Sequence, residues 1–230
     1  MVIQLGPNFL AQPGNWFAAG GEVMWPLLAF SILAIALIIE RLIFWFKVLK
    51  RTDRLVRESL SLYRRNPKAS LGLLEKHADL PIARIFLAAL ELDQATPEEF
   101  RLALESSAQA ELPLLKRFST VFETIISLAP LLGLLGTVLG LIRSFASLTL
   151  NSVGGKNTLE VTGGVSEALI STASGLGVAI VTLLFANSFR GLYLRQLAMI
   201  QEYGGQLELL YRRRFDTGGA RYTPTQEPRY

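Results

Sequence analysis

The chain has 230 residues, of which 50% are hydrophobic and 18% are charged, and its mean hydropathy is +0.36. This balance is typical of a membrane protein rather than a soluble domain. The formal net charge is +4 and cysteine is absent, which excludes disulfide frameworks, thiol nucleophiles and cysteine-ligated metal sites.

Three uncharged stretches approach the roughly 20 residues that a helix needs to cross a bilayer. They are Thr124–Ile142, Ala168–Phe189, and Val23–Ile39, which extends to Phe46 if Glu40 and Arg41 pair or reach the interface. We therefore predict an all-α membrane protein with transmembrane helices at 23–46, 123–148 and 164–189.

Basic residues are concentrated after the stretches that begin at Val23 and Ala168. The loop 149–163 between the second and third stretches has Lys156 as its one basic residue. The positive-inside rule then predicts that the N-terminus lies outside and the C-terminus inside. The same basic residues suit anionic lipids of the inner leaflet. Because no nucleic-acid-binding motif accompanies them, no nucleic-acid partner is predicted.

The other segments connect these helices. We predict an external N-terminal segment at 1–22, a helical cytoplasmic domain at 47–122, an external loop at 149–163, a cytoplasmic helical extension at 190–215 and a disordered tail at 216–230. The extension should lie beside the helix that leads into the second span, because its apolar residues recur at helical spacing.

Proline positions predict the helix starts of the cytoplasmic domain. Asn66-Pro67, Pro81 and Thr96-Pro97 have the expected pattern, and Thr96 with Glu99 forms a capping box. From Pro97 the helical pattern continues into the second span. Only Pro113 interrupts it, so we expect one long helix that bends there.

The second span has one face of small and polar residues. They are Glu123, Ser127, Pro130, Gly133, Thr137, Gly140 and Ser144. Such a face meets either another helix at close range or a solvated lumen. Gly136 and Gly140 form a GxxxG pattern, which is common in helix packing and has low specificity.

The third span has a similar polar face. Its members are Glu167, Ser171, Ser174, Gly175, Val178 and Thr182, and Thr172 lies roughly 100° further round than Ser171. Because hydrocarbon makes polar side chains costly, this face indicates the wall of a pathway. A partly desolvated carboxyl favours its protonated form, so Glu167 is a candidate proton relay. The alternative is a carboxylate at the outer interface that pairs with Lys156 or Arg143.

The spans lack the groups that intramembrane enzymes need. No aspartate or histidine lies in them, and no HExxH, Walker or dinucleotide-binding motif occurs in the chain. No enzymatic activity, cofactor or metal site is therefore expected.

Two segments resemble a known family. Ala129–Gly140 in the second span (APLLGLLGTVLG) and Ser166–Leu176 in the third (SEALISTASGL) resemble the MotA/TolQ/ExbB proton channel family, the ExbB and TolQ branch in particular. The resemblance covers the three spans, their orientation, the cytoplasmic insertion and the helical extensions. The chain departs from the family pattern in lacking a proline at 161–166 and at 177–181.

The resemblance implies a homopentamer in a bacterial inner membrane, with the second and third helices around a central pore. The pore would hold a dimeric ExbD-like or TolR-like single-span partner whose aspartate carries the proton. A TonB-like or TolA-like protein would receive the work. Thr137 and Thr172 would line the pore and Glu167 would lie near its outer entrance. The neighbouring pathway residues are Ser171, Ser174, Pro130 and Gly133, and the helix-packing residues are Gly136, Gly140 and Gly175.

The preferred function is therefore an ExbB-like role, in which the proton motive force energises TonB-type transport across the outer membrane. One alternative is a TolQ-like subunit of the Tol-Pal envelope-integrity system, because these pore motifs serve both roles. The other is a membrane scaffold that conducts no protons.

Overall fold

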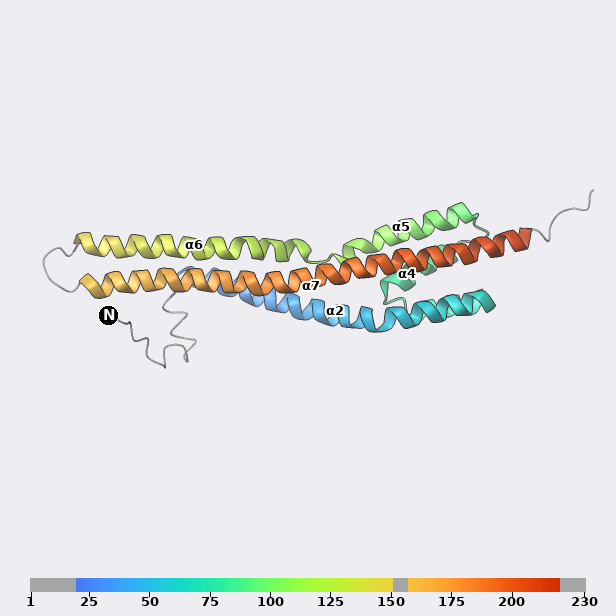
Figure 1. The fold of residues 1–230 in the computed structure, drawn as a ribbon, viewed down its shortest axis with the longest axis horizontal. Coiled ribbons are helices and arrows are strands. Elements are labelled where there is room, and N and C mark those ends of the chain that lie inside the picture. The colour runs from blue at the N-terminus through green and yellow to red at the C-terminus, as the bar shows by residue number, and fades with distance from the viewer. Residues whose placement is uncertain (1–19, 151–156, 220–230) are drawn as a thin grey trace, which may run out of the picture. The chain divides into compact units, whose positions relative to one another are not determined.

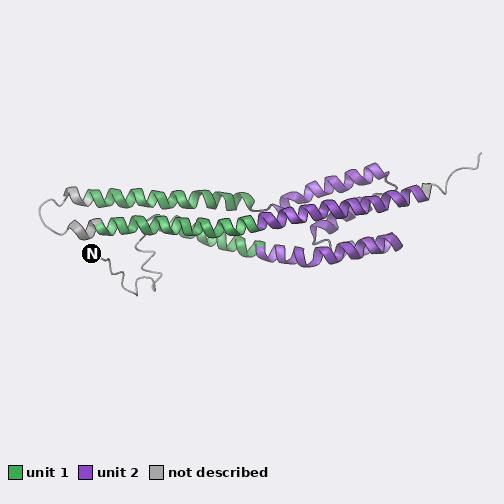
Figure 2. Ribbon diagram, in the orientation of Figure 1, with its two compact units in different colours: residues 1–41, 118–188 green, residues 42–117, 189–230 purple. Residues whose placement is uncertain are grey.

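The computed structural model describes residues 20–150 and 157–219, and these contain helices and turns but no strand. The helices are α2 (Met24–Arg65), α3 (Pro67–Glu75), α4 (Pro81–Leu90), α5 (Pro97–Leu115), α6 (Ser119–Leu150) and α7 (Asn157–Gly219) (Figure 1). The predicted all-α fold is confirmed for the described residues. Contacts divide the chain into unit 1, residues 1–41 and 118–188, and unit 2, residues 42–117 and 189–230 (Figure 2).

Unit 1 is an apolar helical bundle. Val23 and Leu27 form a buried cluster with Ala129 of α6 and Ala179 of α7. The aliphatic side chains that face outward from α6 are exposed, which suits contact with hydrocarbon. The segments Met24–Arg65, Pro97–Ala146 and Thr162–Thr217 each contain a stretch long and apolar enough to cross a membrane. The predicted span 164–189 lies within the third segment, and the predicted spans 23–46 and 123–148 overlap the first two except for residues 23, 147 and 148.

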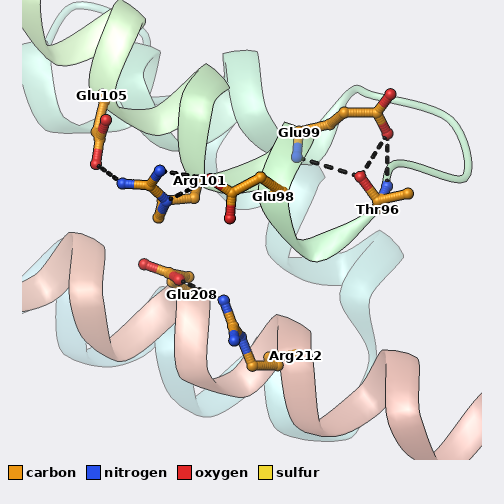
Figure 3. Close-up of polar contacts among 7 residues, drawn as sticks. All are labelled: Thr96, Glu98, Glu99, Arg101, Glu105, Glu208 and Arg212. Atoms are coloured by element: carbon orange, nitrogen blue, oxygen red, sulfur yellow. Dashed lines mark hydrogen bonds and ion pairs between the residues drawn. The ribbon is translucent and has the colours of Figure 1, made fainter.

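The helix starts of unit 2 are those that the prolines predicted. Asn66 caps α3 by accepting a hydrogen bond from the Ala69 amide, and α4 begins at Pro81. The capping box of α5 is complete, because the Thr96 amide donates to Glu99 at 2.7 Å and the Glu99 amide donates to the Thr96 hydroxyl (Figure 3). The bond from the Thr96 amide, with a second from its hydroxyl, lowers the pKa of Glu99 below the ordinary 4.5.

The extension in α7 lies beside α5 within unit 2, as predicted. The Tyr211 ring stacks on Phe100 with centroids 4.0 Å apart, and the Tyr211 hydroxyl donates to the Ala95 carbonyl at 2.7 Å. Figure 3 shows charged residues on both helices: Arg101 binds Glu98 and Glu105 on α5, and Arg212 binds Glu208 on α7. The hydrogen bond from Arg101 lowers the pKa of Glu98.

The expected single helix bent at Pro113 is wrong. α5 continues through Pro113 to Leu115, a turn follows, and α6 begins at Ser119. Phe118 has φ +68°, and a left-handed residue just after a helix ends it. Within unit 1 the buried Arg41 guanidinium lies 5.5 Å from the Phe118 ring centroid, a cation–π contact that holds this residue in place.

Helix bounds also refine the predicted segments. α6 extends to Leu150 and α7 begins at Asn157, so both enter the predicted loop 149–163. The tail predicted from Asp216 begins inside α7, which continues to Gly219. Residues 1–19, 151–156 and 220–230 lie outside the described part of the chain. The predictions for the N-terminal segment 1–22 and the tail 216–230 therefore fall mostly on residues that are not described.

Candidate functional site

The small-residue face of α6 lies against α7 in unit 1, where the two helices run side by side (Figure 1). A Cβ built on Gly133 would lie 3.0 Å from the Thr172 Cα and 3.1 Å from the Ser171 carbonyl oxygen. A Cβ on Gly136 would collide with the Ser171 hydroxyl. A larger residue at either position would displace Ser171 or move the helices apart, so glycine permits this close approach.

The contact is reciprocal along its length. A Cβ on Gly175 would collide with the Ala129 carbonyl oxygen of α6. Further along, a Cβ on Gly140 would lie 2.8 Å from the Gly164 carbonyl oxygen, and one on Gly164 would lie 2.8 Å from the Gly140 carbonyl oxygen. The predicted packing residues Gly136, Gly140 and Gly175 all lie in this contact, and so does Gly133, which the sequence placed beside the pathway.

The two candidate pore hydroxyls are both partly exposed. The Thr172 hydroxyl donates across the contact to the Gly133 carbonyl at 3.1 Å. The Thr137 hydroxyl donates within α6 to the Leu134 carbonyl at 2.6 Å. The two acceptor carbonyls belong to the consecutive residues Gly133 and Leu134, so both hydroxyls are anchored on the same turn of α6. Each oxygen has lone pairs that can accept a hydrogen bond from water or from a protonated carboxyl group.

The other predicted pathway residues differ in burial. Ser171 is buried, donates to the Ala168 carbonyl of its own helix at 2.8 Å and lies 3.4 Å from the Gly133 carbonyl of α6, so it belongs to the α6–α7 contact. Ser174 is partly exposed and donates to the Ile170 carbonyl at 2.8 Å. Pro130 is partly exposed on α6. The structure thus gathers Gly133, Ser171 and Thr172 in one place.

Glu167 lies in an ion-pair cluster of unit 1. Arg143 of α6 donates from Nη1 to the Glu167 Oε1 at 2.6 Å. Its Nη2 lies 3.0 Å from the Oε1 of Glu22, in the turn before α2. The sequence left pairing with Lys156 or Arg143 open. Arg143 is the partner seen, and Lys156 lies outside the described residues.

The hydroxyl groups of this site can accept and donate hydrogen bonds. They are too weakly acidic to carry a proton themselves at neutral pH. The uncharged stretches of α6 and α7 contribute hydroxyls and no carboxylate, and Glu167 stands only at the end of the α7 stretch. Among the described residues no group of three His, Cys, Asp or Glu side chains could hold a metal ion.

Comparisons with known proteins agree with these features. The MotA/TolQ/ExbB proton channel family matches residues 77–202, more than half of the chain. The chain belongs to this family. An ExbB-like biopolymer transport protein of Synechocystis sp. is 64% identical over 198 residues, which cover 86% of this chain and 94% of the relative. A second ExbB-like protein of Synechocystis sp. is 43% identical over 90% of this chain and 83% of the relative.

The TolQ branch is also similar to this family member. The TolQ protein of the Tol-Pal system in Haemophilus influenzae is 34% identical over 119 residues, which cover 49% of each chain. With three apolar stretches of membrane-spanning length, this MotA/TolQ/ExbB protein is a multi-pass membrane protein.

Two residues of the Glu167 cluster were missed by the sequence reasoning. Glu22 and Gly21 lie in the turn before α2, so helical periodicity assigns them to no face. The available signal was local: a glycine followed by an acid, immediately before an apolar stretch that starts a span.

Proposed function

We propose that this chain is the pore-forming subunit of an inner-membrane proton-channel motor of the ExbB type. Copies of the chain form a ring, the N-terminus lies outside, and a ExbD-like single-span partner occupies the centre. The motor uses the proton motive force to energise TonB-type transport across the outer membrane. The chain performs no enzymatic reaction and uses no cofactor.

One observation supports most directly the idea that this chain supplies hydroxyl groups and a partner supplies the proton-carrying carboxylate. The walls offer hydroxyl oxygens at Thr137 and Thr172, but the uncharged stretches that carry them have no carboxylate. A hydroxyl accepts a hydrogen bond from a protonated group, yet its own acidity is far too weak to carry a proton at neutral pH. A partner must therefore bring the titrating carboxylate to the level of the hydroxyls.

Two relatives named ExbB-like are our reason for preferring the ExbB role to the TolQ role. The ExbB-like relatives align over most of this chain at higher identity, whereas the TolQ relative aligns over about half of it. A conducting role is favoured over a scaffold because the Thr137 and Thr172 hydroxyls are partly exposed and keep lone pairs that can accept a further hydrogen bond.

The test is proton flux into liposomes that contain the chain together with its single-span partner, co-purified from the native membrane. Thr137→Val and Thr172→Val should each lower the flux at least tenfold while the complex still assembles. Thr182→Val is the matched control, because the Thr182 hydroxyl is buried and bonds only to its own helix, at Val178.

Two results would overturn the proposal. If both valine variants conduct as well as the Thr182→Val control, the chain is a scaffold. If the chain alone conducts as fast as the complex, no partner carboxylate is needed. Binding of a TolA-like instead of a TonB-like protein by the complex would assign the TolQ role.

A further inference from the structure

Unit 2 contains a pocket between the C-terminal end of α2 and the C-terminal part of α7. Its volume is about 300 Å³, at the lower end of the range for pockets that bind small molecules. The residues that line it are Tyr63, Arg64, Leu210, Arg213, Arg214 and Thr217. Half of these residues are arginines and none is acidic, so the pocket attracts anions.

The three pocket arginines form no ion pair with an acid among the described residues. The neighbouring Arg212 differs, because it binds Glu208 at 3.3 Å. Asp216, the acid nearest to the pocket arginines along α7, is exposed and does not line the pocket. An anion that enters the pocket therefore meets guanidinium groups whose donors no carboxylate occupies.

Two ordinary explanations do not account for these charges. Basic residues in the last turn stabilise the C-terminus of a helix, which explains Arg64 in α2 but not Arg213 and Arg214, because the last turn of α7 contains no basic residue. Attraction to lipid headgroups falls off within about 8 Å at physiological ionic strength. Arg213 lies roughly 36 Å beyond Phe189, the end of the predicted third span, at about 1.5 Å per residue of α7.

We propose that this pocket binds the phosphate group of a small soluble compound. A phosphate group carries up to two negative charges near neutral pH, and its oxygens accept the forked, charge-assisted hydrogen bonds that guanidinium groups donate. Tyr63 is buried and Leu210 is half-buried, so this side of the pocket excludes water and strengthens those bonds. A bound phosphate would join Arg64 of α2 to the arginines of α7. The site lies in unit 2 alone and does not rest on the proposed proton pathway.

The test is a phosphorus NMR titration of inorganic phosphate with the full-length chain in dodecyl maltoside micelles at constant ionic strength. The unchanged chain should show saturable binding. Arg213→Gln and Arg214→Gln should each raise the Kd about tenfold, as expected for the loss of one charge-assisted hydrogen bond. Arg214→Lys should raise it less, because the charge remains although the fork is lost.

Arg212→Gln is the matched control. It removes the same charge at the adjacent position, but from a side chain that Glu208 already engages outside the pocket, so the Kd should change less than about twofold. Arg213 and Arg214 are exposed and their side chains form no ion pair among the described residues, so their glutamine variants should fold normally. The lipid control is phosphatidylglycerol added to the micelles, which should leave the phosphate Kd unchanged.

Weaker binding in Arg213→Gln and Arg214→Gln but not in Arg212→Gln supports the proposal. Equal weakening in all three variants overturns it, because it would reveal diffuse attraction to a basic helix surface. The absence of saturable binding also overturns it. Competition by phosphatidylglycerol would assign these arginines to lipid headgroups and would equally reject a soluble ligand. None of these outcomes bears on proton flux, so the proposed function is tested separately.

Discussion

The closeness of α6 and α7 can be tested at Gly175. In Gly175→Ala the added methyl group would lie 3.1 Å from the Gly133 Cα and 3.2 Å from its nitrogen, besides colliding with the Ala129 carbonyl. All of these are backbone atoms of α6, so no side chain can rotate away and the helices must move apart. Gly177→Ala is the matched control, because a Cβ there meets nothing within 4 Å.

Three free-energy contributions together predict that Gly175→Ala destabilises the protein. Overpacking costs about 1–3 kcal/mol, and a wider separation also weakens the hydrogen bond from Thr172 to Gly133, worth about 1 kcal/mol. Alanine offsets about 1 kcal/mol of this through its higher helix propensity. Gly175→Ala should therefore be destabilised by about 1–3 kcal/mol, whereas Gly177→Ala should be unchanged or slightly more stable.

The assay is equilibrium unfolding of the full chain by sodium dodecyl sulfate in mixed micelles, followed by tryptophan fluorescence. Gly191→Ala, another position where a Cβ meets nothing within 4 Å, serves as a second control. If Gly175→Ala proved as stable as the two controls, the close backbone contact between α6 and α7 would be refuted.

Two further predictions concern unit 2. Thr96→Ala should destabilise α5 by about 1 kcal/mol through loss of its N-cap, measured by thermal unfolding. In the unchanged chain the same cap should weaken as the pH falls below about 4.5, because a lowered pKa of Glu99 means that its contribution is present above that value and lost on acidification. Tyr211→Phe keeps the ring that stacks on Phe100 but removes the hydrogen bond to the Ala95 carbonyl, which should cost about 1 kcal/mol in urea unfolding. Burial raises the pKa of Tyr211 above 10.0, so this contribution should persist below about pH 10 and be lost at higher pH, and an identical alkaline transition in Tyr211→Phe would contradict it.

Local signals explain why much of the fold could be predicted from the sequence. The N-caps at Asn66 and Thr96 satisfy amides within three residues, so the pattern that identifies them is also the physical cause of the helix start. The signal for the membrane-spanning stretches is equally local, because the length and composition of a stretch decide whether it can cross a bilayer.

The break between α5 and α6 depends instead on tertiary context. Pro113 carries the expected sequence signal, yet the helix tolerates it. The left-handed residue is Phe118, for which no turn signal exists, and its ring lies beside the buried Arg41 of α2. A residue so distant in the sequence is invisible to a pattern of neighbouring residues.

The sequence predicted which residues belong to the candidate site, but not what each of them contacts. Helical periodicity placed Gly133 and Thr137 on one broad face of α6, but a period cannot distinguish a neighbouring helix from a lumen. The structure shows that Gly133 contacts Thr172 of the same chain while Thr137 remains partly exposed. The face is therefore divided: Gly133 meets a neighbouring helix, whereas Thr137 is partly exposed in this chain.

This division has a consequence for how protons could move. Gly133, Gly136, Gly140 and Ser144 of α6 pack against α7. The α6 surface that does not contact α7 is therefore aliphatic between Pro130 and Ile142, with Thr137 as its single polar side chain. A continuous chain of water needs hydrogen-bonding groups at successive levels, and one hydroxyl supplies only one level. Between Pro130 and Ile142, α6 therefore offers a single hydroxyl level at Thr137, which does not support a standing file of water. Under the proposed function, the proton would therefore need the carboxyl group of a partner to pass the level of Thr137.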